Sequence, residues 1–190
     1  MDFIHADNDD MYDGFPGMAL VRAWEKARFW FQSNTKRQAL KNISYHYDLG
    51  NDFYSLWLDD TMTYSSALFN TSQESLEKAQ IAKYASMVDQ MGVKPGDHVL
   101  EIGCGWGGFA EYAAKERGLK VTGLTISKEQ LEYAQKRIKR KGLSDKVNLK
   151  LQDYRDETGV YDGVASIEMF EAVGEKYWPV YFDKIKQCLK

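Results

Sequence analysis

The sequence predicts an α/β fold built on a parallel β-sheet, with strands and helices alternating along the chain. Two observations carry this prediction. Short apolar segments rich in β-branched residues alternate with segments whose apolar residues recur at helical spacing. The helical segments are bounded by glycines and by Ser or Thr capping patterns, which mark helix ends. Strands separated by helices in this way normally pair in parallel.

Each element can be placed from local signals. The first strand begins after the turn at residues 94–97, with His98 as a structural residue at its edge, and the next three are expected at Lys120–Thr125, 147–152 and 161–167. Capping boxes at Thr71/Glu74 and Ser127/Gln130 predict two helix starts, and Gly92 and Gly142 predict the corresponding ends. A helix is expected at 109–117, and a last one opens near Pro179. The residues expected on the inner faces are Ile81, Ala85 and Val88; Leu131, Ala134 and Ile138; and Tyr181, Phe182, Ile185 and Leu189.

A glycine-rich turn follows the first strand and predicts a ligand site. Gly103, Gly105 and Gly108 fit the G-x-G-x-x-G spacing, which dinucleotide-binding proteins also use, and a purely structural turn is a third interpretation. Glu101 discriminates among them, because a carboxylate two residues before the first glycine would repel a pyrophosphate. A dinucleotide site also needs an acid about 20 residues further on, and the segment 122–127 has none. These features favour a ligand with an ammonium group and no phosphate, such as the methionine part of S-adenosylmethionine.

Composition excludes several classes of protein. The chain has 190 residues, of which 44% are hydrophobic, and a net charge of −3, which suits one globular domain with an accessory segment. Cys104 and Cys188 lie far apart and form no C-x-x-C pattern, so we expect neither a disulfide framework nor a metal site. No segment has transmembrane length or a signal-peptide pattern, and we expect a cytoplasmic protein with no nucleic-acid partner.

The chain divides into three predicted parts. Residues 1–17 form an acidic tail, 18–75 a helical cap or lid, and 76–190 the α/β domain. Within the cap, residues 18–41 form a basic amphipathic helix with aromatic residues. This helix either lies on an anionic membrane surface or packs on its own domain.

Ligands of parallel α/β sheets bind at the carboxyl ends of the strands. In this sequence those ends supply polar residues and glycines from all four strands: 101–107, Thr125, Asp153 with Tyr154, and Glu168. Their convergence is stronger evidence for a site than any one motif.

Six segments then resemble a known family. They are HYDLGNDF (46–53), YSSA (64–67), GCGWGG (103–108), TISKEQ (125–130), LQDYR (151–155) and MFEAVG (169–174). In this order they resemble the cyclopropane-fatty-acyl-phospholipid synthases and mycolic acid cyclopropane synthases, over residues 40–190. The resemblance implies a Rossmann-like class I methyltransferase fold, with S-adenosylmethionine as methyl donor and a cis double bond of a phospholipid acyl chain as acceptor.

The resemblance also assigns residues to the donor. Tyr64 and Ser65 are assigned to the methionine end, and Gly103, Gly105 and Gly107 to the centre of the donor. Thr125 and Gln130 are assigned to the ribose, and Asp153 and Tyr154 to the adenine. Gln130 can bind the ribose and also belong to the Ser127/Gln130 capping box, because this capping box lies at the ligand end of its helix.

The chemistry expected of the family needs two further groups. Methyl transfer to an alkene leaves a cation on the acyl chain, which the aromatic faces of Tyr47, Tyr64 or Trp106 could stabilise, although Trp106 could also serve only in packing. Ring closure then needs a base, which the resemblance implies is a bicarbonate held partly by a glutamate that Glu171 matches. A carboxylate favoured by a helix start is the alternative interpretation of Glu171.

Two positions depart from the family pattern. Many members have Cys at the position of Ser66 and His at the position of Ala172. A serine can still donate a hydrogen bond, but an altered base site would allow loss of a different proton. The product would then carry a methyl or methylene branch rather than a ring.

Further expectations concern the number of strands, the activity of the chain and its partners. Class I methyltransferases have a seven-stranded sheet, so four strands suggest a truncated chain with little activity of its own, or a non-catalytic module that binds the donor. An ordinary small-molecule methyltransferase is another alternative. The expected partners are unsaturated phospholipids at the inner face of a membrane, and a homodimer is possible.

Overall fold

The computed structural model describes residues 50–190. The predicted acidic tail, the basic helix at 18–41 and the candidate Tyr47 lie outside the described residues. The described residues comprise the remainder of the cap and the whole of the predicted α/β domain.

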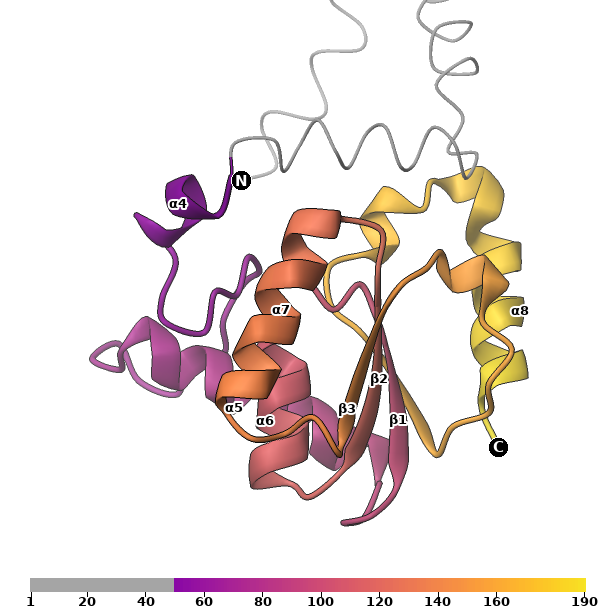
Figure 1. Cartoon of the computed structure of the whole chain (residues 1–190), viewed down its shortest axis with the longest axis horizontal. Helices are drawn as coiled ribbons and strands as arrows, with labels where there is room; N and C mark the ends of the chain where they lie inside the picture. Colours follow the sequence, from indigo (N-terminus) through magenta and orange to yellow (C-terminus); the bar gives the residue numbers. More distant parts are fainter. Residues whose placement is uncertain (1–49) are drawn as a thin grey trace, which may run out of the picture.

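The predicted parallel sheet is confirmed. Its strands are β1 (His98–Ile102), β2 (Lys120–Thr125), β3 (Val147–Leu151) and β4 (Gly163–Ser166), and they lie in the order β3-β2-β1-β4. All three neighbouring pairs are parallel. The chain moves outward from β1 to β3 and then crosses to the other side of β1, so the strand order reverses between β1 and β4 (Figure 1).

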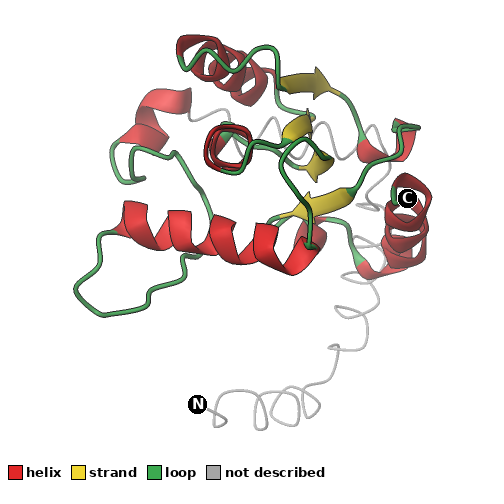
Figure 2. Ribbon diagram, turned by 90° about the horizontal axis from the view of Figure 1, so that it is seen from below, coloured by secondary structure: helices red, strands yellow, loops and turns green. Residues whose placement is uncertain are grey.

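Helices cover both faces of the sheet. One face carries α5 (Leu76–Met91), α6 (Gly108–Glu116) and α7 (Lys128–Arg140), and the other carries α8 (Trp178–Cys188). The short 3-10 helices η1 (Tyr154–Asp156), η2 (Phe170–Ala172) and η3 (Glu175–Tyr177) lie in the connections on either side of β4. Figure 2, turned by 90°, shows the strands between the two sets of helices.

Alternation along the strands produces two cores, because successive side chains point to opposite faces. Val99 and Val121 pack with Phe109 and Ala113 of α6 and with residues of α5 and α7. Leu100 and its neighbours on the other face pack with Tyr181 of α8. Both faces of β1 are therefore buried, as expected of a central parallel strand.

The structure corrects the predicted start of α5. The capping box at Thr71 and Glu74 does not cap this helix; Ser75 does, and its hydroxyl accepts a hydrogen bond from the amide of Lys78. Glu74 instead accepts from the amide of Asn70. Of the predicted inner face, Val88 is buried and Ala85 packs against the core, but Ile81 is 36% exposed, whereas Gln80 and Tyr84 are buried.

The last elements also differ in detail. Pro179 lies in the first turn of α8 as predicted, and Tyr181 is buried. Phe182 and Leu189, expected inside, are 55% and 41% exposed. Strand β4 is shorter than the predicted segment 161–167, because Tyr161 leaves the ladder and pairs with Leu189 through an isolated bridge.

The described cap consists of α4 (Gly50–Ser55) and an irregular segment that leads to α5. Arg137 of α7 fastens this segment by donating from Nη1 to the carbonyl oxygen of Thr61 at 2.6 Å, while its Nε donates to Glu111 of α6 at 2.5 Å. The Thr61 and Thr63 hydroxyls lie 2.6 Å apart, and the Thr63 hydroxyl hydrogen-bonds that of Tyr84. No helix within residues 50–190 is long and apolar enough to cross a membrane.

Candidate active site

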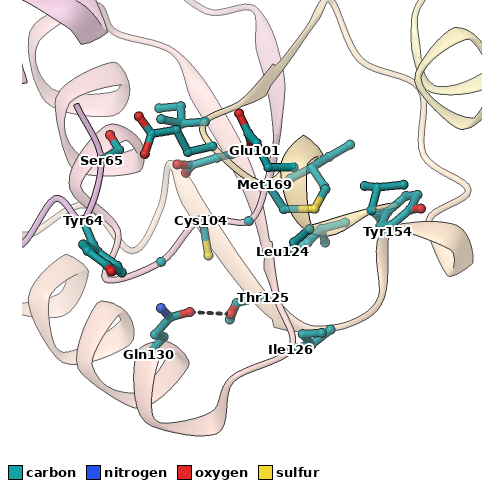
Figure 3. Close-up of a pocket in the computed structure, with 18 of the residues that line it drawn as sticks. Tyr64, Ser65, Glu101, Cys104, Leu124, Thr125, Ile126, Gln130, Tyr154 and Met169 are labelled. Carbon is teal, nitrogen blue, oxygen red and sulfur yellow. Dashed lines mark hydrogen bonds between the residues drawn. The ribbon is translucent and has the colours of Figure 1, made fainter. Parts of the chain in front are cut away.

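A cavity of about 970 Å³ lies at the carboxyl ends of the strands, where the strand order reverses. Both its position and its size are typical of ligand sites in parallel α/β folds. Its walls come from the ends of β1 and β2, from the glycine turn after β1, from the segments that follow β3 and β4, and from residues 62–65 of the cap. Figure 3 shows the labelled side chains arranged around this common space.

The glycine turn after β1 brings backbone to the cavity wall. Gly103 and Gly105 have φ angles of 83° and 50°, which favour glycine. A Cβ at Gly103 would lie 3.0 Å from Cγ of Met169, whereas one at Gly105 would meet no atom within 4 Å. Gly105 therefore leaves open space beside its backbone, where a ligand can approach closely.

The next two glycines serve packing. Gly107 does not line the cavity; it precedes α6, and a Cβ there would lie 3.1 Å from Cβ of Ala134 on α7. A Cβ at Gly108 would lie 2.6 Å from the hydroxyl oxygen of Tyr84. These two positions allow α6 to approach α7 and the cap segment closely.

Glu101 is a carboxylate inside the central strand. Its side chain is 2% exposed, and Oε2 is buried with no hydrogen-bond partner among the described residues. Burial raises its pKa to about 8, because the low-dielectric surroundings disfavour the charged form. An orphaned carboxylate oxygen beside a cavity is the feature expected where a cationic ligand supplies the missing partner.

Thr125 and Gln130 meet at the end of β2. The Thr125 hydroxyl donates to Oε1 of Gln130 at 3.0 Å and accepts from the amide of Ser127 at 3.1 Å. Ser127 caps α7 by accepting from the amide of Gln130, as the capping pattern predicts. Gln130 thus joins the cap of a helix to a polar wall of the cavity (Figure 3).

Asp153, Tyr154 and Arg155 form the wall after β3. The Asp153 carboxylate accepts from the amide and the guanidinium of Arg155, with a shortest distance of 2.5 Å. The guanidinium also lies over the Tyr154 ring, 5.5 Å from its centroid. Burial raises the pKa of Tyr154, which partly faces the cavity.

Residues 64–66 form a lid segment over the cavity. Tyr64 is 49% exposed and packs on the ring of Trp57. From α5, Gln80 donates to the carbonyl oxygen of Ser65 at 2.8 Å, and Lys83 donates to that of Ser66 at 2.7 Å. The lid is also bonded to the residue that follows β4, because the amide and hydroxyl of Ser66 donate to Oε1 of Glu168 at 2.8 and 2.6 Å.

Most of the predicted site residues converge on this cavity. Those that line it are Tyr64, Ser65, Glu101, Gly103, Gly105, Thr125, Gln130, Asp153, Tyr154 and Glu171. Ser66 lies beside the cavity and contacts it through Glu168. Trp106 lines the cavity but is 3% exposed, and its Nε1 donates to Asn51 at 2.6 Å.

Sequence reasoning placed Glu168 among the residues that converge at the strand ends but assigned it no role, and it did not single out Lys83. Glu168 has a φ of 48°, unusual for a residue other than glycine, and it lines the cavity. No local pattern reveals its contact with Ser66, because the two residues are 102 positions apart. An acid directly after an apolar strand was the available signal.

The comparisons with known proteins agree with this geometry. Residues 34–190 match the family model described as mycolic acid cyclopropane synthetase. The chain belongs to this family. It is 45% identical over 156 residues to a probable fatty acid methyltransferase of Pseudomonas putida, covering 81% of this chain and 40% of that protein. It is 43% identical over 160 residues to the cyclopropane-fatty-acyl-phospholipid synthase of Escherichia coli K12, covering 84% and 41%.

Solved structures show the same relationship. The mycolic acid cyclopropane synthase CmaA1, complexed with SAH and CTAB, superposes with a TM-score of 0.76 at 32% identity, over 80% of this chain and 53% of that one. The predicted Rossmann-like class I methyltransferase fold is thereby confirmed. The chain spans about two fifths of the length of the curated relatives it matches.

Proposed function

We propose that this protein is an S-adenosylmethionine-dependent methyltransferase that acts on the double bond of unsaturated acyl chains in lipids. The observation that carries the proposal is the orphaned Oε2 of Glu101, buried at the end of the central strand beside the open glycine turn. The relatives add support, because their names are those of lipid methyltransferases and a cyclopropane synthase, and one solved relative holds SAH, the demethylated form of this donor.

The residues present fit the methyl donor. Its methionine part carries an ammonium and a sulfonium, and Glu101 offers the one fully buried carboxylate among the described lining residues. Gly105 leaves backbone accessible to the centre of the ligand, and Gln130 and Tyr154 line the same cavity further along. When bound, the donor supplies an electrophilic methyl group.

A dinucleotide fits less well. Its ribose is normally held by an acid at the end of the second strand, where this chain has the Thr125–Gln130 pair. Glu101 would also repel a pyrophosphate at the glycine turn.

An alkene is a poor nucleophile, so the protein has to hold the acceptor close to the methyl group and in line with it. Tyr64 presents a half-exposed ring at the cavity, and an aromatic face stabilises a developing cation where water is excluded. We place the acyl chain against this lid.

A lipid surface is the proposed source of the acyl chain. Large apolar side chains are exposed on the cap around the lid: Phe53, Leu56, Trp57, Leu68 and Phe69. Aromatic and leucine side chains of this kind insert into the interfacial region of a bilayer. We therefore expect peripheral association with membranes that contain unsaturated phospholipids.

The product is a cyclopropane ring or, as the alternative, a methyl or methylene branch. A relative named as a probable fatty acid methyltransferase and one named as a cyclopropane-fatty-acyl-phospholipid synthase match the chain at nearly equal identity, so similarity does not discriminate between the products. The departures at Ser66 and Ala172 favour keeping the branched product as a candidate.

Calorimetry and lipid analysis test the proposal. The purified chain should bind S-adenosylmethionine and S-adenosylhomocysteine and should not bind NAD. Lipids of cells that express the gene encoding this chain should gain one CH2 unit per modified acyl chain, and NMR distinguishes a ring from a branch. Binding of NAD in place of the donor would contradict the proposal, and donor binding without any lipid product would favour a non-catalytic module.

A further inference from the structure

Glu168 follows β4 and places a carboxylate on the cavity wall, next to the lid. Its φ of 48° lies in the left-handed region, which a non-glycine residue adopts at a cost. The backbone conformation directs this side chain toward residues 64–66 rather than along the strand. A strained residue whose side chain faces a cavity is a candidate for a functional role.

The two hydrogen bonds from Ser66 hold one oxygen of this carboxylate in place. The amide and the hydroxyl both donate to Oε1, at 2.8 and 2.6 Å. Oε2 accepts no hydrogen bond from any residue in the range 50–190, and the side chain is exposed. One carboxylate oxygen is therefore held by the lid, on a residue that lines the cavity.

No described cation forms an ion pair with Glu168. Lys83 comes near, but its Nζ donates to the carbonyl oxygen of Ser66 and to the Ser65 hydroxyl. Lys83 is half-buried, and burial lowers its pKa although the charges of Glu168 and Asp59 raise it. Lys83 therefore leaves Oε2 of Glu168 without a hydrogen-bond partner among the described residues.

We propose that Glu168 is the general base of the second step, in place of an external bicarbonate. This inference rests on the proposed function, in which methyl addition leaves a cation on the acyl chain. In the second step a C–H bond of the added methyl group breaks, and its electron pair closes the third side of the ring. The proton passes to Oε2 of Glu168. For the methylene branch, a 1,2-hydride shift first moves the cation to the carbon that carries the added methyl group. Loss of a methyl proton to Oε2 then leaves its electron pair as the C=CH2 double bond.

The contacts at Ser66 explain why a free anion is not needed. A bicarbonate bound there would compete with Glu168 for the amide and hydroxyl donors, and its charge would lie beside the carboxylate. Glu171, which matches the glutamate of the family's bicarbonate site, lines the same cavity from η2. The protein's own carboxylate thus fills the anion position.

Two substitutions of Glu168 separate its role as a hydrogen-bond acceptor for Ser66 from its role as a proton acceptor. Glu168→Gln keeps an oxygen that accepts from Ser66 but removes the proton acceptor. Glu168→Gly empties the position, and glycine suits the observed φ, so the fold is expected to tolerate the change. Glu132→Gln, an exposed position on α7, is the matched control for loss of one carboxylate.

Binding is measured first, by titrating the purified chain with 13C-bicarbonate in the presence of S-adenosylhomocysteine and following the NMR signal. The wild-type chain, E168Q and E132Q should not bind bicarbonate, and E168G should bind it. Bicarbonate bound by the wild-type chain as tightly as by E168G would overturn the inference. This readout does not depend on turnover.

Product formation is measured second, in lipids of cells that express each version of the gene encoding this chain. E168Q should lower product by roughly a hundredfold or more, the range of general-base catalysis, with unchanged affinity for the donor. E168G should retain product in cells, because it is expected to bind the bicarbonate that cells contain, and E132Q should behave as wild type. Wild-type product from E168Q would overturn the inference. A wild-type chain that does not bind the donor would instead contradict the proposed function.

Discussion

The hydroxyl of Thr125 donates to Oε1 of Gln130 at 3.0 Å, across the gap between the end of β2 and the first turn of α7. This bond fixes the orientation of the Gln130 amide, so that its NH2 group is the end left to donate. Dinucleotide-binding folds place an acid near this point to accept from a ribose. Here the wall of the cavity presents an amide donor and a shared hydroxyl instead.

The first prediction concerns Gln130. Gln130→Ala should weaken binding of S-adenosylmethionine by roughly fivefold, because a net hydrogen bond contributes about 1 kcal/mol. Calorimetric titration measures the change. Gln90→Ala on α5, where the side chain bonds only Ser86 across an exposed turn, is the control and should leave affinity unchanged. Equal affinities for Q130A and the wild-type chain would remove Gln130 from the site.

The sequence predicted the site better than it predicted the helix faces. Strand ends and the glycine turn carry local signals, and Glu101, Gly105 and Thr125 all line the cavity as expected. On α5 the prediction was right for Val88 and Ala85 but wrong for Ile81. It was also wrong for the capping residue, because Ser75 caps the helix. Capping rules do not decide between two candidate capping residues that lie a few positions apart.

Other features could not have been read from local pattern. Phe182 lies three residues before Ile185, a helical spacing, yet it is 55% exposed and contacts the ring of Phe170. The bonds between Ser66 and Glu168 join segments more than a hundred residues apart. Such contacts depend on how the cap lies over the sheet, which periodicity does not encode.

The second prediction concerns the stability cost of Glu101. Its pKa is raised from an ordinary value of 4.5 to about 8, so the folded state binds more protons than the unfolded state between these values. The free energy of unfolding should therefore fall as pH rises from about 4.5 to about 8. Glu101→Gln should remove this fall and stabilise the ligand-free chain above pH 8. Denaturant melts at several pH values measure it, and parallel pH profiles for the two chains would contradict the assignment.

The third prediction concerns the pH dependence of donor binding. A cation beside Glu101 favours the carboxylate, so its pKa falls when the donor binds. Binding below pH 8 should then release a proton, and affinity should rise with pH up to about 8 and level off above it. Calorimetry in buffers of different ionisation enthalpy measures the released proton. The donor's own amino group titrates in the same way with the wild-type chain and with E101Q. Any part of the pH dependence of donor affinity that E101Q loses therefore comes from Glu101.

The fourth prediction compares two glycines. Gly105 and Gly142 both have positive φ, and an added Cβ meets no protein atom within 4 Å at either position. Alanine at each should cost a similar backbone strain, on the order of 1 kcal/mol. Gly105→Ala should also prevent donor binding, because its Cβ would enter the space beside the glycine turn, whereas Gly142→Ala should bind normally. Equal binding by the two variants would show that the ligand does not approach Gly105.

The fifth prediction concerns the contacts that hold the cap. Arg137 is 8% exposed and joins Glu111 of α6 to the carbonyl oxygen of Thr61. Burial raises the pKa of Glu111, but hydrogen bonds and charge from Arg137 and Lys141 outweigh burial and lower it. Arg137→Met removes the main partner and leaves a poorly solvated carboxylate, so we expect a loss of about 3–5 kcal/mol in the free energy of unfolding.

Two further variants separate this buried pair from ordinary surface charge. Lys141 lies 3.2 Å from Glu111 but its side chain is 42% exposed, so Lys141→Met should cost less than about 1 kcal/mol. Adding Glu111→Gln to R137M should recover part of the loss, because the uncompensated charge is gone. Since the pKa of Glu111 is lowered, the wild-type contribution should be present above about pH 4.5 and disappear as the pH falls through the lowered value, as measured by acid denaturation. Equal losses for R137M and K141M would mean that the cap is held by other contacts, chiefly those of Gln80 and Lys83.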